Sequence, residues 1–99
     1  MVKKYEVYFC EIKGHEKPCV VVSPDEMNAL LPYALVAPIT KNQRNFPSRM
    51  GVKLKGEKAQ IALDLIRVVA QEKMVRKAGA LPDYLKKEMQ QLLKDFLIQ

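Results

Sequence analysis

The sequence predicts one domain of mainly β structure, a small barrel or sheet with two added helices. Two apolar runs, residues 18–22 and Tyr33–Thr40, each begin beside a proline and are too short for a buried helix, so each is predicted to be a strand. Residues 82–97 instead repeat their apolar side chains at helical spacing. A chain of 99 residues can bury a single core, so residues 1–99 are expected to form one domain.

The first strand is predicted at residues 5–12, where apolar and polar side chains alternate. It pairs most naturally with residues 18–22. A two-residue turn at Gly14 and His15 would place Pro18 at a hydrogen-bonded position of the ladder, where proline has no N–H to donate. We therefore expect residues 14–17 to form a wider loop.

A short helix is predicted directly after the second strand. Ser23 can cap the helix by accepting a hydrogen bond from the backbone of Glu26, and the Glu26 side chain can reach back to the cap. Pro24 suits the first helical position, and Pro32 sets the limit of the helix. The sequence thus predicts a capping box on about two helical turns.

The second half of the chain continues the β pattern. Apolar and polar residues alternate in Arg49–Leu54, residues 55–58 form a turn, and residues 59–69 are predicted to contain one or two strands. Asp64 interrupts that apolar run, so it either accepts backbone hydrogen bonds or faces a functional site. Residues 71–77 are predicted to be a polar turn or loop.

The C-terminal helix has a proline in its first turn and Asp83 at its positive end. Its apolar stripe consists of Leu85, Met89, Leu92, Leu93, Phe96 and Leu97. This stripe either covers the core of the domain or forms a subunit contact.

Charge and composition narrow the functional classes. The net charge is +6, and between Lys41 and Lys58 six basic residues face one acidic residue. This excess indicates RNA, DNA or an acidic protein as partner, or else a loop kept soluble by its charge. No apolar run approaches about 18 residues, so we expect a soluble, cytoplasmic protein without a membrane segment. Cys10 and Cys19 are expected to be structural thiols, because the chain offers no partners for a metal site.

Five short motifs follow one another in a familiar order. They are Gly-His-Glu at residues 14–16, Lys-Pro followed by valines from residue 17, Ser-Pro at residue 23, Ala-Pro-Ile-Thr at residues 37–40 and Leu-Asp-x-x-Arg at residues 63–67. Together they resemble the MazF/PemK/Kid family of toxins from toxin–antitoxin systems, over nearly the whole chain. The resemblance implies an SH3-like barrel that forms a homodimer. It also implies an endoribonuclease of single-stranded RNA that needs no metal or cofactor and is neutralised by an acidic antitoxin.

The resemblance assigns roles to individual residues. His15, Lys17, Thr40 and Asp64 are the expected catalytic residues. The expected RNA-binding residues are Glu6, Glu16, Arg67 and, from the basic stretch, Lys41, Arg44 and Arg49. Lysine stands at position 17 where the family has arginine, and Ala62 stands where some members have another arginine. Because lysine lacks the planar fork that binds two phosphate oxygens, Arg44 or Arg49 could supply that fork.

Two other functions are compatible with the sequence. The departures at Lys17 and Ala62 suit a member that still binds RNA but no longer cleaves it. A CcdB-like toxin that binds gyrase would share the barrel, but this chain ends in Phe96-Leu97-Ile98-Gln99 without the tryptophan-rich ending associated with that group.

Overall fold

The computed structural model describes residues 1–97 and, at Leu97, the backbone alone. Its strands are β1 (Glu6–Ile12), β2 (His15–Val21), β3 (Tyr33–Thr40), β4 (Arg49–Leu54), β5 (Glu57–Ala62), β6 (Arg67–Ala70) and β7 (Met74–Ala80). Its helices are α1 (Asp25–Leu30), α2 (Asp83–Leu97) and the 3-10 turns η1 (Leu63–Leu65) and η2 (Gln71–Lys73). Ile98 and Gln99, which belong to the C-terminal ending considered above, lie outside the described residues.

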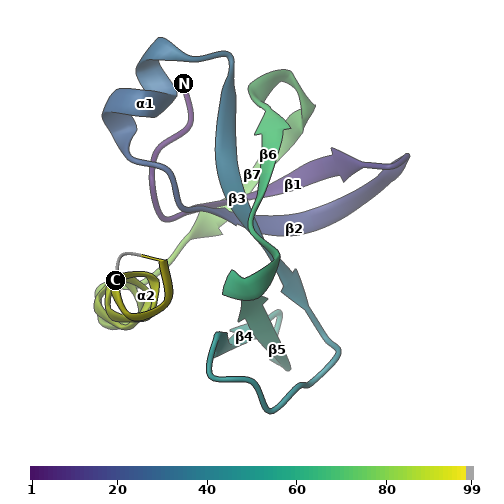
Figure 1. Cartoon of the computed structure of the whole chain (residues 1–99). Helices are drawn as coiled ribbons and strands as arrows, with labels where there is room; N and C mark the ends of the chain where they lie inside the picture. Colours follow the sequence, from purple (N-terminus) through teal and green to yellow (C-terminus); the bar gives the residue numbers. More distant parts are fainter. Residues whose placement is uncertain (98–99) are drawn as a thin grey trace.

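The strands form one antiparallel sheet in the order β4-β5-β3-β2-β1-β7, and β6 pairs with β3. The sheet curls into a half-barrel, with α1 beyond one end of β3 and α2 below the crossing strands (Figure 1). The prediction of a mainly β, SH3-like barrel with a short helix after the second strand and a C-terminal helix is confirmed.

The turn between β1 and β2 is tighter than predicted. Ile12 pairs with His15, which leaves the two-residue turn Lys13-Gly14, and both turn residues have positive φ, 52° and 79°. Pairs of a hairpin alternate outward from such a turn, so Phe9 and Pro18 meet at a non-hydrogen-bonded position. The predicted wider loop was wrong, because moving the turn one residue earlier relieves the conflict at Pro18.

The helix α1 lacks the predicted capping box. Pro24 is its N-cap, and no side chain caps the helix. Ser23 is buried and donates instead to Asn28 Oδ1 at 2.5 Å, while its Oγ accepts the Leu35 amide at 3.0 Å. The Ser23 hydroxyl therefore serves a buried backbone group of β3, which leaves it unavailable as a cap.

β7 occupies most of the stretch predicted to be a polar loop. It pairs with β1, and register shifts interrupt the ladder in two places. Only Met74 of its seven residues is buried. The sequence of β7 consequently shows no alternation of apolar and polar residues, and backbone pairing with β1 holds the strand.

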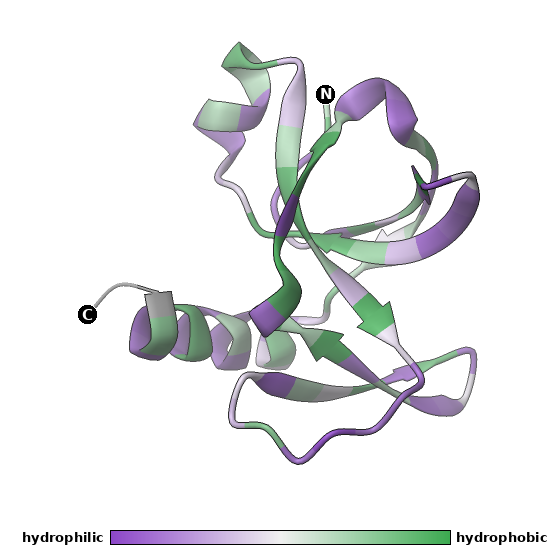
Figure 2. Ribbon diagram, turned by 45° about the vertical axis from the view of Figure 1, so that its right-hand side comes forward, coloured by the Kyte–Doolittle hydropathy of each residue, from purple (hydrophilic) through white to green (hydrophobic). Residues whose placement is uncertain are grey.

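Two buried clusters lie on the two sides of β2. Val20 and Val22 join the cluster that α2 completes with Leu85 and Met89, whereas Cys19 and Val21 join the other. The continuous apolar run predicted to be a strand is thus buried on both faces. The stripe residues Leu85, Met89, Leu92 and Leu93 cover the core, as one of the two interpretations predicted, whereas Phe96 is 44% exposed and the Leu97 side chain lies outside the described part of the chain. Hydrophilic residues gather on the connection between β3 and β4 (Figure 2).

The two cysteines fit the expected structural role. Cys10 and Cys19 are free and fully buried. Hydrogen bonding with Cys10 and burial both hold the pKa of the Cys19 thiol well above its ordinary value. The raised pKa leaves Cys19 with little thiolate character, whereas hydrogen bonding with Cys19 lowers the pKa of the Cys10 thiol.

Candidate functional site

Three of the residues singled out by the sequence line one shallow depression. Lys17 comes from β2, Asp64 from η1 and Arg67 from the first position of β6. The depression measures about 410 Å³, and its other walls are Ile12, Pro38, Leu65 and Ile66. Lys17 therefore faces the same small space as Asp64 and Arg67, although it lies far from both in the sequence.

η1 brings Asp64 to this place. β5 and β6 both pair with β3, and η1 interrupts the ladder between them. Asp64 therefore lies in a turn rather than in a strand. In a strand its side chain would have been confined to one face of the sheet.

Asp64 is held by the neighbouring strand and loop. Arg49 donates to it through Nε at 2.8 Å and through a second guanidinium nitrogen at 3.2 Å, and Ser48 donates at 3.1 Å. These hydrogen bonds, that from Arg49 foremost, lower the pKa of Asp64 despite partial burial. Asp64 is therefore ionised at neutral pH and is a weak base.

Arg49 is almost buried, because its side chain is only 7% exposed. Its guanidinium lies 5.3 Å from the centre of the Phe46 ring, and its Nη1 has no hydrogen-bond partner in the described part of the chain. The bidentate pair with Asp64 occupies the guanidinium edge that would otherwise bind phosphate. The geometry thus offers little of Arg49 to RNA.

Thr40 lies at the end of β3 but does not line the depression. Continuing the register of Cys19 with Pro38 by two residues would set Lys17 opposite Thr40. The ladder between β2 and β3 ends at the pair of Cys19 with Pro38, however, and Thr40 pairs with Gln60 of β5 on the other edge of β3. The Thr40 hydroxyl accepts the amide of Asn42 at 3.1 Å and so holds the start of the basic loop.

His15 and Glu16 are exposed at the first two positions of β2. Glu16 accepts from Arg76 of β7 at 2.7 Å, and the Arg76 guanidinium lies 4.2 Å from the centre of the Phe9 ring. Sequence reasoning missed Arg76 because β7 was predicted to be a loop. Neither His15 nor Glu16 lines the depression around Lys17.

Glu6 is committed to contacts inside the protein. It accepts from Lys77 at 2.6 Å, from the Lys3 amide at 2.7 Å and from the Tyr8 hydroxyl at 3.1 Å. Burial alone would raise the pKa of Glu6, but these hydrogen bonds together lower it. The geometry of Glu6 is that of a carboxylate joining β1 to β7.

The basic loop between β3 and β4 keeps two cations exposed. Lys41 pairs with Glu57 at 2.5 Å, and both side chains are largely exposed. The Arg44 backbone is fixed by Gln60, which accepts from its amide at 3.0 Å and donates to its carbonyl at 3.1 Å. The Arg44 side chain consequently extends from an anchored backbone.

A second depression, of about 400 Å³, was not found from the sequence. Phe9 and Pro18 line it together with Lys41, Lys55 and Glu57. Pro18 follows Lys17 directly and so faces the opposite side of β2. In the sequence Phe9 shares the apolar face of the first strand with Tyr5 and Val7, so it resembled a core residue.

The described residues carry neither a metal-ligand cluster nor a membrane helix. Within residues 1–97, no three His, Cys, Asp or Glu residues gather closely enough to hold a metal ion. None of the helices in this part of the chain is both long and apolar enough to cross a bilayer.

Comparison with known families decides the relationship. Residues 3–97 match the family described as PemK-like, MazF-like toxin of type II toxin-antitoxin system. The chain belongs to this toxin family. No curated protein matches the sequence.

Solved structures of this toxin group share the fold at low sequence identity. A mycobacterial endoribonuclease in complex with its cognate antitoxin is 16% identical, with 98% of this chain and 95% of that one covered at a TM-score of 0.88. The Mycobacterium tuberculosis toxin MazF-mt6 is 15% identical, covers 91% and 93%, and gives a TM-score of 0.81. A MazE-MazF structure from Deinococcus radiodurans is 16% identical, covers 97% and 94%, and gives 0.82. More than nine tenths of the chain thus shares the fold of these structures.

Proposed function

We propose that the protein is an endoribonuclease toxin that cleaves single-stranded RNA without a metal ion. In this reaction the RNA 2'-hydroxyl attacks the adjacent phosphate and leaves a 2',3'-cyclic phosphate and a 5'-hydroxyl end. The observation that carries the proposal is the placement of Lys17 and Arg67 in one depression of a MazF-like fold.

Lys17 and Arg67 suit the charge that develops on the phosphate. The attack creates a crowded phosphorane, and cationic donors fixed around it stabilise the transition state. Arg67 supplies a planar fork for two phosphate oxygens, which Lys17 lacks. Lys17 supplies a mobile ammonium group that can also protonate the leaving 5'-oxygen. Because lysine stands at position 17 in place of the family's arginine, another residue must bind two phosphate oxygens at once. Arg67 is a better candidate for this role than Arg49.

Asp64 has a supporting part in this scheme. Its low pKa makes it a weak acceptor of the 2'-hydroxyl proton, and its oxygens are already used by Arg49 and Ser48. We assign Asp64 the role of fixing η1, the turn that precedes Arg67. His15 and Thr40 remain candidates for contacts with the RNA outside the depression.

The remaining cations fit an RNA path. Lys41 and Arg44 extend from the exposed loop between β3 and β4, where they can neutralise phosphates of any sequence. The depression around Phe9 lies beside this loop, since Lys41 also lines it. An aromatic ring flanked by cations is suited to stacking a nucleobase.

We also propose a homodimer and a cognate antitoxin. A protein of this size leaves apolar side chains uncovered, and Leu65 and Val68 beside the depression are more than half exposed. A two-fold contact on that side would bring two depressions together. The antitoxin is expected to be acidic and to occupy the cationic path.

Labelled single-stranded RNA incubated with the purified protein in EDTA tests the function. We expect cleavage into fragments with cyclic phosphate ends, read by mass spectrometry. The same assay with Lys17→Ala should lose activity, while Lys87→Ala, which removes an exposed lysine on α2, should keep it. Retention of RNA without cleavage would favour the degenerate RNA-binding alternative. The absence of both retention and cleavage would refute the proposal.

A further inference from the structure

The strand β4 has a free edge. It is the last strand of the sheet, and β5 is its sole partner among the described residues. The two are joined by the two-residue turn Lys55-Gly56, with φ of 53° and 80°. Pairs alternate from such a turn, so Leu54 and Glu57 exchange hydrogen bonds whereas Lys53 and Lys58 do not.

This alternation fixes which backbone groups point outward. The N–H and C=O groups of Gly51 and Lys53 face away from β5, toward the free edge. Arg49 is the third outward residue, and its amide indeed turns away from β5 to the Phe46 carbonyl at 3.1 Å. Gly51 and Lys53 thus offer four backbone groups at the spacing of a strand.

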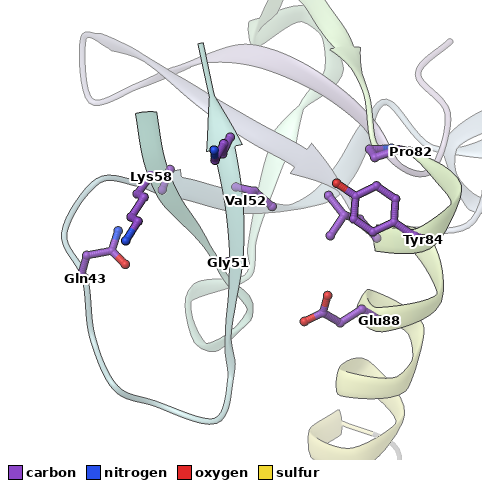
Figure 3. Close-up of a pocket in the computed structure, with 10 residues that line it drawn as sticks. Gln43, Gly51, Val52, Lys58, Pro82, Tyr84 and Glu88 are labelled. Carbon is purple, nitrogen blue, oxygen red and sulfur yellow. The ribbon is translucent and has the colours of Figure 1, made fainter. Parts of the chain in front are cut away.

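A trough of about 580 Å³ runs along this edge and separates it from α2. In Figure 3, Tyr84 and Glu88 reach from α2 toward β4, with Gly51 and Val52 on the opposite wall. Tyr84 is 73% exposed, so little else covers it. A Cβ added at Gly51 would meet no atom within 4 Å, so the space beside this residue is open.

The two faces beside the edge differ in chemistry. On the outer face Lys53 lies directly opposite Lys58, and like charges in that position repel. Neither lysine has an ion-pair partner within residues 1–97. On the inner face the trough is lined by Val52, Leu85 and Pro82. Glu88 on the α2 wall disfavours acidic groups on that inner side.

We propose that the free edge of β4 is a docking site for an extended segment of another polypeptide, one that alternates acidic and apolar residues. The segment adds to the sheet as a strand antiparallel or parallel to β4 and pairs with the outward backbone groups of Gly51 and Lys53. Its side chains alternate between the faces, so acidic residues meet Lys53 and Lys58 while apolar residues meet Val52 and Leu85.

A strand fits this site better than RNA does. The outward groups of Gly51 and Lys53 are donors and acceptors in alternation, which is what another strand presents, whereas an RNA backbone offers acceptors and 2'-hydroxyls. Lysines on an edge strand also discourage pairing with apolar or basic strands, and so select an acidic one. The inference does not depend on RNA cleavage, because the trough shares no residue with the depression around Lys17.

The test uses the full chain and a capped peptide of alternating glutamate and valine, about eight residues long and so long enough to form a strand. Amide hydrogen exchange followed by NMR reports on individual residues. Binding should slow exchange at Gly51 and Lys53 by at least about tenfold at saturation. The same peptide with an N-methyl group at every residue carries equal charge but has no backbone N–H to donate from either edge, and it should bind at least about tenfold more weakly.

Two variants separate backbone pairing from charge. Lys53→Ala removes the cation and should weaken binding about threefold. Lys53→Pro also removes the outward N–H, which an edge strand tolerates, and should abolish detectable binding. Equal losses in both variants would show that charge alone attracts the peptide and would overturn the proposal. The proposal would also be overturned by unchanged exchange at Gly51 and Lys53 of the wild type with the peptide at millimolar concentration, or by RNA that protects the Gly51 amide equally in both variants.

Discussion

The pair formed by Arg49 and Asp64 predicts a specific loss of stability in Asp64→Asn. The Arg49 side chain is 7% exposed and that of Asp64 28% exposed, so the two hydrogen bonds at 2.8 and 3.2 Å are largely shielded from water. Removing the negative charge leaves the Arg49 guanidinium buried beside a neutral amide. Hydrogen bonds to charged groups contribute about 1.5–3 kcal/mol, and the partial exposure of Asp64 favours the lower half of that range.

We therefore expect Asp64→Asn to lower the free energy of unfolding by about 2 kcal/mol at neutral pH. For a domain of this size the melting temperature should fall by about 10 °C. Thermal unfolding followed by circular dichroism measures both. Glu57→Gln is the matched control, since it breaks the exposed pair with Lys41 and should leave the melting temperature almost unchanged.

The same comparison has a defined pH dependence. The pKa of Asp64 in the folded protein lies below its ordinary value of 3.8, so the unfolded chain binds this proton first as the pH falls. The stabilising contribution is complete above that value and is lost as the pH falls through the folded pKa. Wild type and Asp64→Asn should therefore converge in stability in acid. The structural role of this pair would be refuted if wild type and Asp64→Asn had the same melting temperature at pH 7, or if their difference in melting temperature increased in acid.

Three further outcomes are expected. Lys17→Ala should lower the single-turnover rate of RNA cleavage on the order of 100-fold with little change in RNA affinity, and a rate within about twofold of wild type would place the site elsewhere. Lys41→Ala and Arg44→Ala should each weaken RNA binding and reduce the slope of log K against log salt by about 0.7, measured by fluorescence anisotropy; an unchanged slope would remove that residue from the RNA path. Glu6→Gln should destabilise the protein by about 1 kcal/mol above pH 4.5 and progressively less in acid, because the pair with Lys77 lowers the pKa of Glu6; equal loss at all pH values would contradict this.

The sequence alone determined the elements whose side chains carry a repeating burial pattern. The run from Cys19 to Val22 is apolar at every position because both faces of β2 are buried. The stripe of α2 repeats at helical spacing because Leu85 and Met89 pack on one cluster. The order of the short motifs was sufficient to identify the family, because recognising motifs requires no knowledge of tertiary contacts.

Where burial leaves no pattern, the tertiary structure decided. β7 buries one residue, so its sequence resembles a loop, and it becomes a strand only by pairing with β1. The hairpin turn begins at Lys13 because this register gives Pro18 a ladder position that requires no N–H. The N-cap is Pro24 because the Ser23 hydroxyl accepts a hydrogen bond from the Leu35 amide instead of capping the helix.

The candidate site shows the same division. Motif positions indicated Lys17, Asp64 and Arg67, but their common depression arises because β5 and β6 follow one another along β3, interrupted by η1. Arg49 was predicted to contact RNA because the sequence shows its charge and not its burial. Its pairing with Asp64 spans 15 residues of chain and exists only when β4 and η1 are folded together, because hydrogen bonding between side chains depends on distance in space rather than on separation in sequence.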